Sequence, residues 1–180
     1  HIEGTLEPEQ MFSFAKRNNI QILFNDINEL KKAYNFSNLE SFLKIYYEGA
    51  KVLLKEQDFF ELTWAYALKC KEDNIVHTEI FFDPQTHTKR GIGFDIVING
   101  IYKALIKAEK EFGLSFKIIM CFLRHLNEEE CFNILDKALA HKDKIFGVGL
   151  DSSEMGNPPK KFEKLFKKAA ENNFITVAHA

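Results

Sequence analysis

Apolar residues gather in four short runs along the last two thirds of the chain. Each run is nearly continuous rather than alternating, and each is rich in β-branched or aromatic residues. The runs lie at residues 75–82, 116–123, 145–150 and 174–178. Continuous apolar runs of this length are typical of strands that are buried on both faces, as in a parallel sheet. The pattern therefore predicts four parallel strands.

Segments with helical periodicity lie between these runs. In Lys160–Asn172 the apolar residues recur three and four positions apart, and Pro158-Pro159 stand where a helix start tolerates proline. A second helix is expected from Asp95, acting as its N-cap, to Gly113, which stops it.

Two further helical segments complete the pattern. Asn127, followed three residues later by Glu130, has the spacing of a capping box and predicts the start of a helix. Residues 38–72 are expected to form one or two long helices, broken or bent near Gln57-Asp58. No internal repeat, low-complexity tract or linker divides the chain.

Strands that alternate with helices at this spacing indicate βαβ units, and two architectures compete for them. One is a (β/α) barrel and the other is a doubly wound sheet. The chain lacks a Gly-x-Gly-x-x-Gly turn after its first strand, which weakens a dinucleotide-binding interpretation. Histidines and acids at strand ends favour the barrel, whose active sites gather at the C-terminal ends of its strands. Four strands and the end of a fifth are too few for a complete barrel.

Composition narrows the functional classes. Apolar residues make up 46% of the chain and charged residues 28%, which fits a globular protein, and a net charge of −2 gives no electrostatic reason to expect nucleic acid as a partner. The three cysteines show no Cys-x-x-Cys spacing, so we expect reduced thiols. No apolar run approaches ~18 residues, no signal peptide is visible, and the chain does not begin with Met. We therefore expect a cytoplasmic protein with no membrane partner and without its native N-terminus.

Histidines are the main candidates for chemistry. His1 and His179 each stand at the tip of an apolar run, where a histidine is well placed to bind a metal ion, although a satisfied hydrogen-bonding role is the more common one. His1-Ile2-Glu3-Gly4 also resembles the remnant of a protease site, but Thr5 stands where that site needs Arg. Three other histidines are assigned plainer positions: His77 inside the barrel, His87 ordering a loop, and His141 in solvent.

Four segments carry a resemblance to a known family. His1–Glu9 resembles the first-strand motif of the adenosine/adenine deaminases, a zinc-dependent branch of the amidohydrolase barrels, and Thr176–Ala180 resembles the fifth-strand motif. Phe81–Gly91 and Gly149–Pro159 are similar to the bacterial adenine deaminases in particular. The resemblance implies about strands 1–5 of a (β/α)8 TIM barrel, with residues 1–180 forming a single partial domain that is incomplete at both ends.

The resemblance also implies site residues. His1 and His179 would bind one Zn²⁺, while the general-acid glutamate would lie just beyond Ala180, so no catalytic residue is expected within the chain. Glu3 would face the substrate, and its length would favour a free base over a nucleoside. The substrate-binding residues implied by the resemblance are Glu3, Gly4, Ser152, Ser153 and Glu154.

The function implied for the intact protein is zinc-dependent hydrolytic deamination of adenine to hypoxanthine and ammonia, in purine salvage. The partner is then a small purine. Adenosine or another 6-aminopurine nucleoside, such as aminodeoxyfutalosine, is the alternative substrate, and a metal-free barrel fragment without catalysis is the alternative of another class. Because half a barrel leaves two sheet edges and some apolar faces uncovered, we expect a portion of a larger folded chain or a homo-oligomer.

Overall fold

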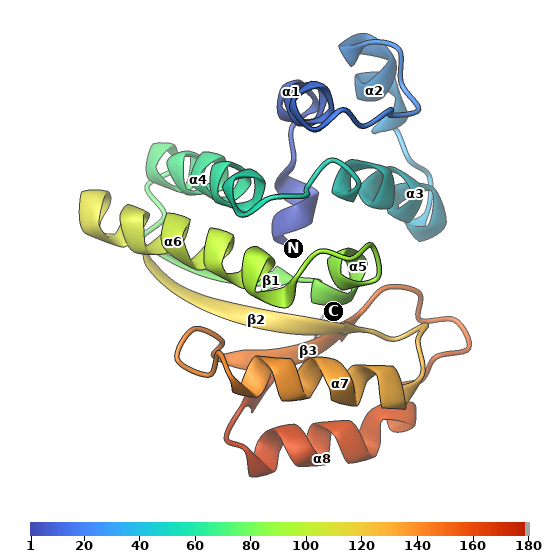
Figure 1. Cartoon of the computed structure of the whole chain (residues 1–180), viewed down its shortest axis with the longest axis vertical. Coiled ribbons are helices and arrows are strands. Elements are labelled where there is room, and N and C mark those ends of the chain that lie inside the picture. The colour runs from blue at the N-terminus through green and yellow to red at the C-terminus, as the bar shows by residue number, and fades with distance from the viewer. Residues whose placement is uncertain (179–180) are drawn as a thin grey trace.

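The computed structural model describes residues 1–178, and a parallel sheet forms its centre. Its strands pair in the order β1-β2-β3-β4, which is their order along the chain (Figure 1). A doubly wound sheet would reverse its order at a switch point, whereas a barrel adds each strand beside the last. The order therefore favours the barrel. The strands are β1 (His77–Phe82), β2 (Ser115–Leu123), β3 (Gly147–Asp151) and β4 (Ile175–Thr176).

Helices connect and cover the strands. In the view of Figure 1, α4 and α6 lie on one side of the sheet and α7 and α8 on the other, while α1 and α2 lie at one end of the long axis. The α-helices are α1 (Pro8–Asn18), α2 (Ile27–Ala33), α3 (Leu39–Ala50), α4 (Glu56–Glu72), α5 (Pro84–Thr88), α6 (Phe94–Phe112), α7 (Glu128–Leu139) and α8 (Glu163–Glu171). Two 3₁₀ helices, η1 (Ile2–Thr5) and η2 (Pro159–Phe162), complete the set within residues 1–178.

Helix boundaries follow the local signals, with two differences. The Asn127 side chain accepts a hydrogen bond from the Glu130 N–H at 2.8 Å, so the predicted start of α7 is confirmed. Gly113 ends α6 with a left-handed φ of 75°, also as predicted. The N-cap of α6 is Gly93, so the prediction of Asp95 as its cap was wrong. The long segment is divided at residues 51–55, earlier than predicted, because the Asp58 carboxylate accepts the N–H groups that open α4.

The core lies between the sheet and the helices. All of β3 is buried, as is β2 from Ile118 onward, which agrees with their continuous apolar runs. At Gly100 the backbones of α6 and α4 approach closely: an added Cβ would lie 2.5 Å from the Glu56 carbonyl oxygen. Glycine permits this approach because it has no side chain. The assignment of residues 1–180 to one partial domain stays a prediction.

The sheet has two open edges within residues 1–178, because β1 pairs with β2 alone and β4 with β3 alone. None of the helices in these residues is both long enough and apolar enough to cross a membrane.

Candidate active site

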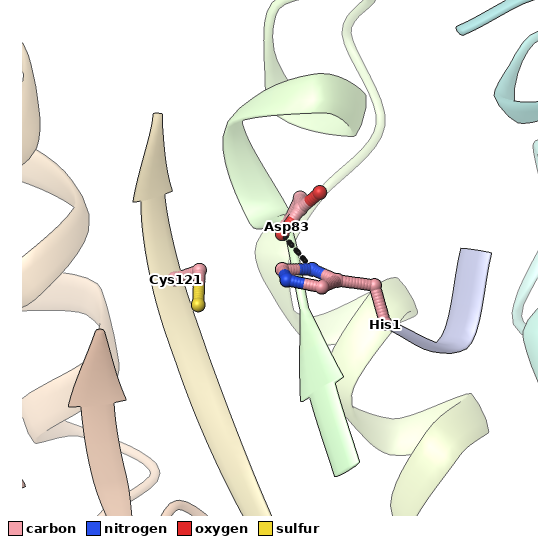
Figure 2. Close-up of side chains that lie close together, drawn as sticks. All are labelled: His1, Asp83 and Cys121. Carbon is pink, nitrogen blue, oxygen red and sulfur yellow. Dashed lines mark hydrogen bonds and ion pairs between the residues drawn. The ribbon is translucent and has the colours of Figure 1, made fainter. Parts of the chain in front are cut away.

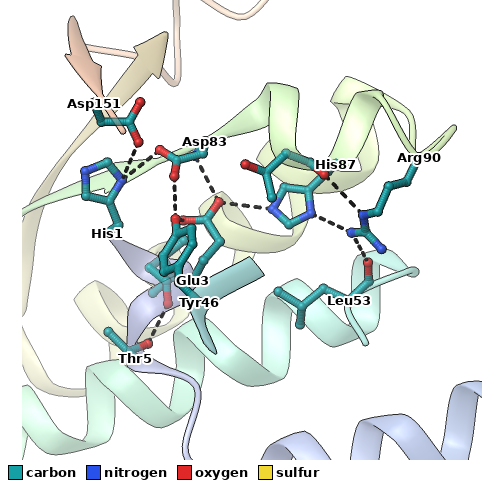
Figure 3. Close-up of polar contacts among 11 residues, drawn as sticks. His1, Glu3, Thr5, Tyr46, Leu53, Asp83, His87, Arg90 and Asp151 are labelled. Atoms are coloured by element: carbon teal, nitrogen blue, oxygen red, sulfur yellow. Dashed lines mark hydrogen bonds and ion pairs between the residues drawn. The ribbon is translucent and has the colours of Figure 1, made fainter. Parts of the chain in front are cut away.

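Polar residues follow three neighbouring strands at the edge where the strands end. Asp83 comes directly after β1, Arg124 directly after β2, and Asp151 is the last residue of β3. Parallel strands present their C-terminal ends at one edge, which is where barrels place their active sites. His1, at the start of η1, joins this group: its Nδ1 lies 2.7 Å from Asp83 Oδ1 (Figure 3). His1 and Asp83, which are 82 positions apart in the sequence, thus share one site.

The His1–Asp83 pair is nearly buried. The His1 side chain is 10% exposed and that of Asp83 is 1% exposed, and the His1 ring stacks on Phe81 with 5.1 Å between ring centroids. Burial alone would lower the pKa of His1, but the hydrogen bond and negative charge of Asp83 outweigh it, so the pKa is raised. Burial would raise the pKa of Asp83, yet the hydrogen bond and charge of His1 lower it. Both shifts favour a charged pair.

Asp151 stands beside this pair in a different state. Its pKa is raised well above the ordinary value by burial and then by the charge of Asp83, so the neutral form of this carboxyl group is favoured at the site. Within residues 1–178 its buried Oδ1 has no hydrogen-bond partner. Such an atom is commonly satisfied by a water, an ion or a ligand. Asp151 therefore gives the site one polar group with unused capacity.

Tyr46 and Glu3 hold Asp83 of the His1–Asp83 pair in place through hydrogen bonds. The Tyr46 hydroxyl bridges Asp83 Oδ2 and Glu3 Oε2, the latter at 3.2 Å. Glu3 Oε1 accepts hydrogen bonds from the Asp83 N–H at 2.9 Å and from His87 Nε2 at 3.0 Å. Burial and the two nearby carboxylates raise the pKa of Tyr46 well above its usual value, so its hydroxyl remains a donor.

A cavity of about 520 Å³ opens in front of this cluster. Leu39, Phe42 and Leu43 of α3 supply an apolar wall, and Asp83 and Asp151 face it. An apolar cavity with a few convergent polar groups is the usual form of a small-molecule site. A second cavity of about 610 Å³ lies beside β4, but its lining does not include His1, Asp83 or Asp151. The first cavity is therefore the candidate site.

The cavity brings together four of the predicted site residues. Its lining includes His1, Gly4, Ser152 and Glu154. Ser153 is not in the lining. The Glu3 carboxylate is also not in it, and lies among protein donors rather than facing the substrate as expected. The physical reason is that the Asp83 N–H, His87 and Tyr46 offer that carboxylate a complete set of partners.

The loop after β3 is held in a defined shape. Ser152 has a left-handed φ of 73°, and its hydroxyl lies 3.0 Å from both the Tyr47 hydroxyl and His125 Nδ1. Arg124, only 7% exposed, forms an ion pair with Glu154 across the same loop. Strained backbone that persists under such fixing contacts is frequent at functional sites.

The donor types at the site suit a zinc ion. One ligand atom each from His1, Asp83 and Cys121 lies within 4.8 Å of the other two, and Figure 2 shows these side chains facing one another from η1, the end of β1 and β2. Imidazole, carboxylate and thiolate are the groups that bind zinc in proteins. The three do not form a closed tetrahedral site, because Asp83 is already hydrogen-bonded to His1. Burial and nearby negative charges also raise the pKa of the Cys121 thiol well above its ordinary value, which disfavours the thiolate that binds zinc. His179, the other predicted ligand, lies outside the described residues.

Three further histidines can be compared with their predicted places. His77 lies on the same face of β1 as Phe81, which stacks on His1, so its predicted place inside the barrel stays a prediction. Its side chain is 45% exposed at the start of β1 and bonds the Ser115 hydroxyl. His87 orders the loop after β1, as expected, and is fully buried. His141 was expected in solvent, but its side chain is only 14% exposed because it packs on Phe94 and bonds Asp95.

Four residues of the cluster were absent from the site predicted from sequence. Asp83 and Asp151 each stand at the end of a strand, and that position was the signal that could have identified them. Tyr46 and Cys121 gave no such signal, since each also fits an apolar face of its helix or strand.

Comparison with known proteins identifies the family. The adenosine deaminase family model matches residues 1–180. The chain belongs to the adenosine deaminase family. Among curated members, an adenine deaminase of Psychrobacter cryohalolentis is 61% identical over 180 residues, which are 100% of this chain and 54% of that protein. The chain therefore spans about half the length of the curated deaminases it matches.

Solved structures of the family agree with the fold. The crystal structure of an adenine deaminase from Arthrobacter aurescens superposes with a TM-score of 0.96 at 46% identity, covering 100% of this chain and 55% of that one. An amidohydrolase from Burkholderia ambifaria, solved with bound Zn, superposes with a TM-score of 0.89 at 23% identity, covering 100% of this chain and 50% of that one. The α/β fold is thus that of the amidohydrolase TIM barrels over part of their length, and the predicted fold class is confirmed.

Proposed function

We propose that the full-length protein containing this chain is a zinc-dependent adenine deaminase, which hydrolyses adenine to hypoxanthine and ammonia for purine salvage in the cytoplasm. The observation that carries the proposal is the 61% identity to a curated adenine deaminase over every residue of the chain. The cavity next to His1 and two acids supports it, because a small heteroaromatic base needs apolar walls with a few polar groups.

Zinc would be held by His1, together with His179 and with ligands that residues 1–178 do not supply. When bound, zinc lowers the pKa of a water molecule to ~7 and so provides a nucleophile at neutral pH. The chain's own part is to hold and shape the site. Asp83 accepts a hydrogen bond from His1 Nδ1 and so orients the ring. The apolar residues of α3 would exclude water around the purine.

The substrate contacts we propose lie on η1 and on the loop after β3. Gly4 belongs to η1, while Ser152, Ser153 and Glu154 follow β3. Ser152 is fixed by Tyr47 and His125, so its backbone has a defined place at the cavity. Asp151 Oδ1, which is buried and has no hydrogen-bond partner within residues 1–178, would accept a hydrogen bond from a ring N–H group of the base.

The test uses the purified full-length protein. We expect about one zinc per chain by plasma mass spectrometry and a spectrophotometric loss of adenine that far exceeds the loss of adenosine. His1→Gln should lose zinc and activity, whereas His77→Gln, at an exposed histidine outside the site, should keep both. Zinc-loaded protein that leaves adenine unchanged refutes the proposal, and faster turnover of adenosine reassigns the substrate to the nucleoside that names the family model.

A further inference from the structure

A chain of hydrogen bonds leads from Arg90, which is exposed, through the buried residues His87 and Glu3 to His1. The Arg90 guanidinium donates to the carbonyl oxygens of Thr86, Lys51 and Leu53 at 3.0–3.1 Å. These contacts tie the end of α5 to the connection between α3 and α4. Arg90 Nη2 also lies 2.9 Å from His87 Nδ1 (Figure 3).

The next link, His87, has its tautomer fixed by this neighbour. A guanidinium group has only donors, so His87 Nδ1 must accept, and Nε2 carries the hydrogen. That N–H donates to Glu3 Oε1 at 3.0 Å. The ring is fully buried and packs edge-on against Phe59, with 4.8 Å between the ring centroids, which fixes its plane.

Glu3 connects His87 to Asp83, because its Oε1 accepts hydrogen bonds from both residues. A buried carboxylate is costly unless donors surround it. Glu3 accepts from His87 and the Asp83 N–H, and it shares the single hydrogen of the Tyr46 hydroxyl with Asp83. Through these contacts Glu3 holds both the backbone and the side-chain partner of Asp83. The two oxygens of Asp83 then accept from Tyr46 and His1.

The consequence for His1 is a single ring orientation. Its Nδ1 points at Asp83, and Figure 2 shows its Nε2 on the side of Cys121 and the strand ends. Metal-binding histidines depend on a partner at the other ring nitrogen, and loss of that partner costs about 10- to 100-fold in metal affinity.

We propose that Glu3, His87 and Arg90 are positioning residues, which act through Asp83 and Tyr46 to aim His1 at the metal. Glu3 then serves the metal ligand rather than the substrate. This inference rests on the proposed zinc function and deepens it. A purely structural network would stabilise the fold without changing how the metal is bound.

The experiment separates these roles in the full-length protein. Glu3→Ala removes the central link, while Glu3→Gln keeps an oxygen for the Asp83 N–H and His87. Zinc affinity is measured by competition with a chelator, and the visible spectrum of the cobalt-substituted protein reports the ligand geometry. We expect Glu3→Ala to bind zinc about 10- to 100-fold more weakly with an altered cobalt spectrum, and Glu3→Gln to stay near the wild type.

Asp58→Ala is the matched control. Asp58 is another fully buried carboxylate, bonded to Arg17, Asn18 and the start of α4. Within residues 1–178 it has no hydrogen bond to His1, Glu3, Asp83 or His87. It should lower the resistance to urea without changing zinc affinity or the cobalt spectrum. Tyr46→Phe, which removes one hydroxyl and keeps the ring, provides a second test if Glu3→Ala does not fold, and it should also weaken zinc binding.

The outcomes are distinguishable. If the wild type binds zinc and deaminates adenine while Glu3→Ala and Tyr46→Phe keep its zinc affinity and cobalt spectrum, the positioning role is overturned and the proposed function stands. If Asp58→Ala weakens zinc binding as much as Glu3→Ala does, the network is only structural. A wild type that binds no zinc overturns both proposals.

Discussion

The close contact between α4 and α6 at Gly100 allows a quantitative test of the packing. In Gly100→Ala the new Cβ would lie 2.5 Å from the Glu56 carbonyl oxygen, 2.6 Å from Phe59 Cβ and 3.1 Å from the Phe60 nitrogen. Carbon atoms pack best about 3.5–4.0 Å apart. All three neighbours belong to the backbone or sit directly on it, so no rotamer change relieves the overlap. The two helices must move apart by roughly 1 Å.

Two opposing effects set the magnitude. Alanine is favoured over glycine inside a helix by about 1 kcal/mol. Overpacking a well-filled core costs about 1–3 kcal/mol, and a shift of rigid backbone belongs at the upper end of that range. The cost of the overlap therefore exceeds the gain in helix propensity, and we expect the free energy of unfolding to fall by about 2 kcal/mol.

Urea unfolding of the full-length protein, followed by circular dichroism, measures this change. Gly93→Ala is the matched control, because it makes the same substitution at the start of the same helix, where the nearest side-chain atoms lie 3.7 Å away. Its loss should stay below about 1 kcal/mol, the usual cost of a weaker N-cap. A Gly100→Ala protein as stable as the wild type would show that the helices do not approach as closely as described.

Two further predictions concern buried groups. Burial alone would raise the pKa of Asp58, but hydrogen bonds led by the N–H groups of Leu54 and Lys55 lower it below its usual 3.8. The stability that ionised Asp58 contributes is therefore present above about pH 4 and is lost as the pH falls through the lowered pKa. In urea unfolding, the free energy of unfolding that Asp58→Asn loses relative to the wild type should be largest near neutrality and shrink in acid. Burial also raises the pKa of the Cys131 thiol to about 11, so mass spectrometry should find Cys131 unmodified by a thiol reagent in the native protein and modified in denaturant.

Local signals in the sequence predicted most of the elements but not all of their boundaries. The run at residues 116–123 became β2 because its side chains are buried on both faces. The exposure of His77 was not predictable because the same kind of run begins in solvent: β1 alternates between exposed and buried residues at its start. Apolar content reveals a strand, but it does not show where along the strand burial begins.

The site was predictable only where chemistry coincides with a strand end. Asp83 could have been proposed in this way, because it follows β1 directly. His1 was predicted from its residue type and motif, and in the structure it precedes η1 rather than ending a strand. Tyr46 could not have been predicted, because its role depends on contacts with Glu3 and Asp83, which are 43 and 37 positions away. The contacts of Glu3 were unpredictable for the same reason: an acid in a motif does not reveal which donors the folded chain will bring to it.

The contacts around His1 also constrain how the protein is made. Its bond to Asp83 and those of Glu3 to Asp83 and His87 join positions 80 to 84 residues apart. At a synthesis rate of about 5–20 residues per second, the first residues wait roughly 4–16 s for these partners. During that interval a nascent chain leaves the Glu3 carboxylate in water and the His1 ring without its orienting acid. Loading of the proposed zinc ion would therefore follow the emergence of α5 from the ribosome, and shorter segments of this chain are expected to leave the imidazole unoriented.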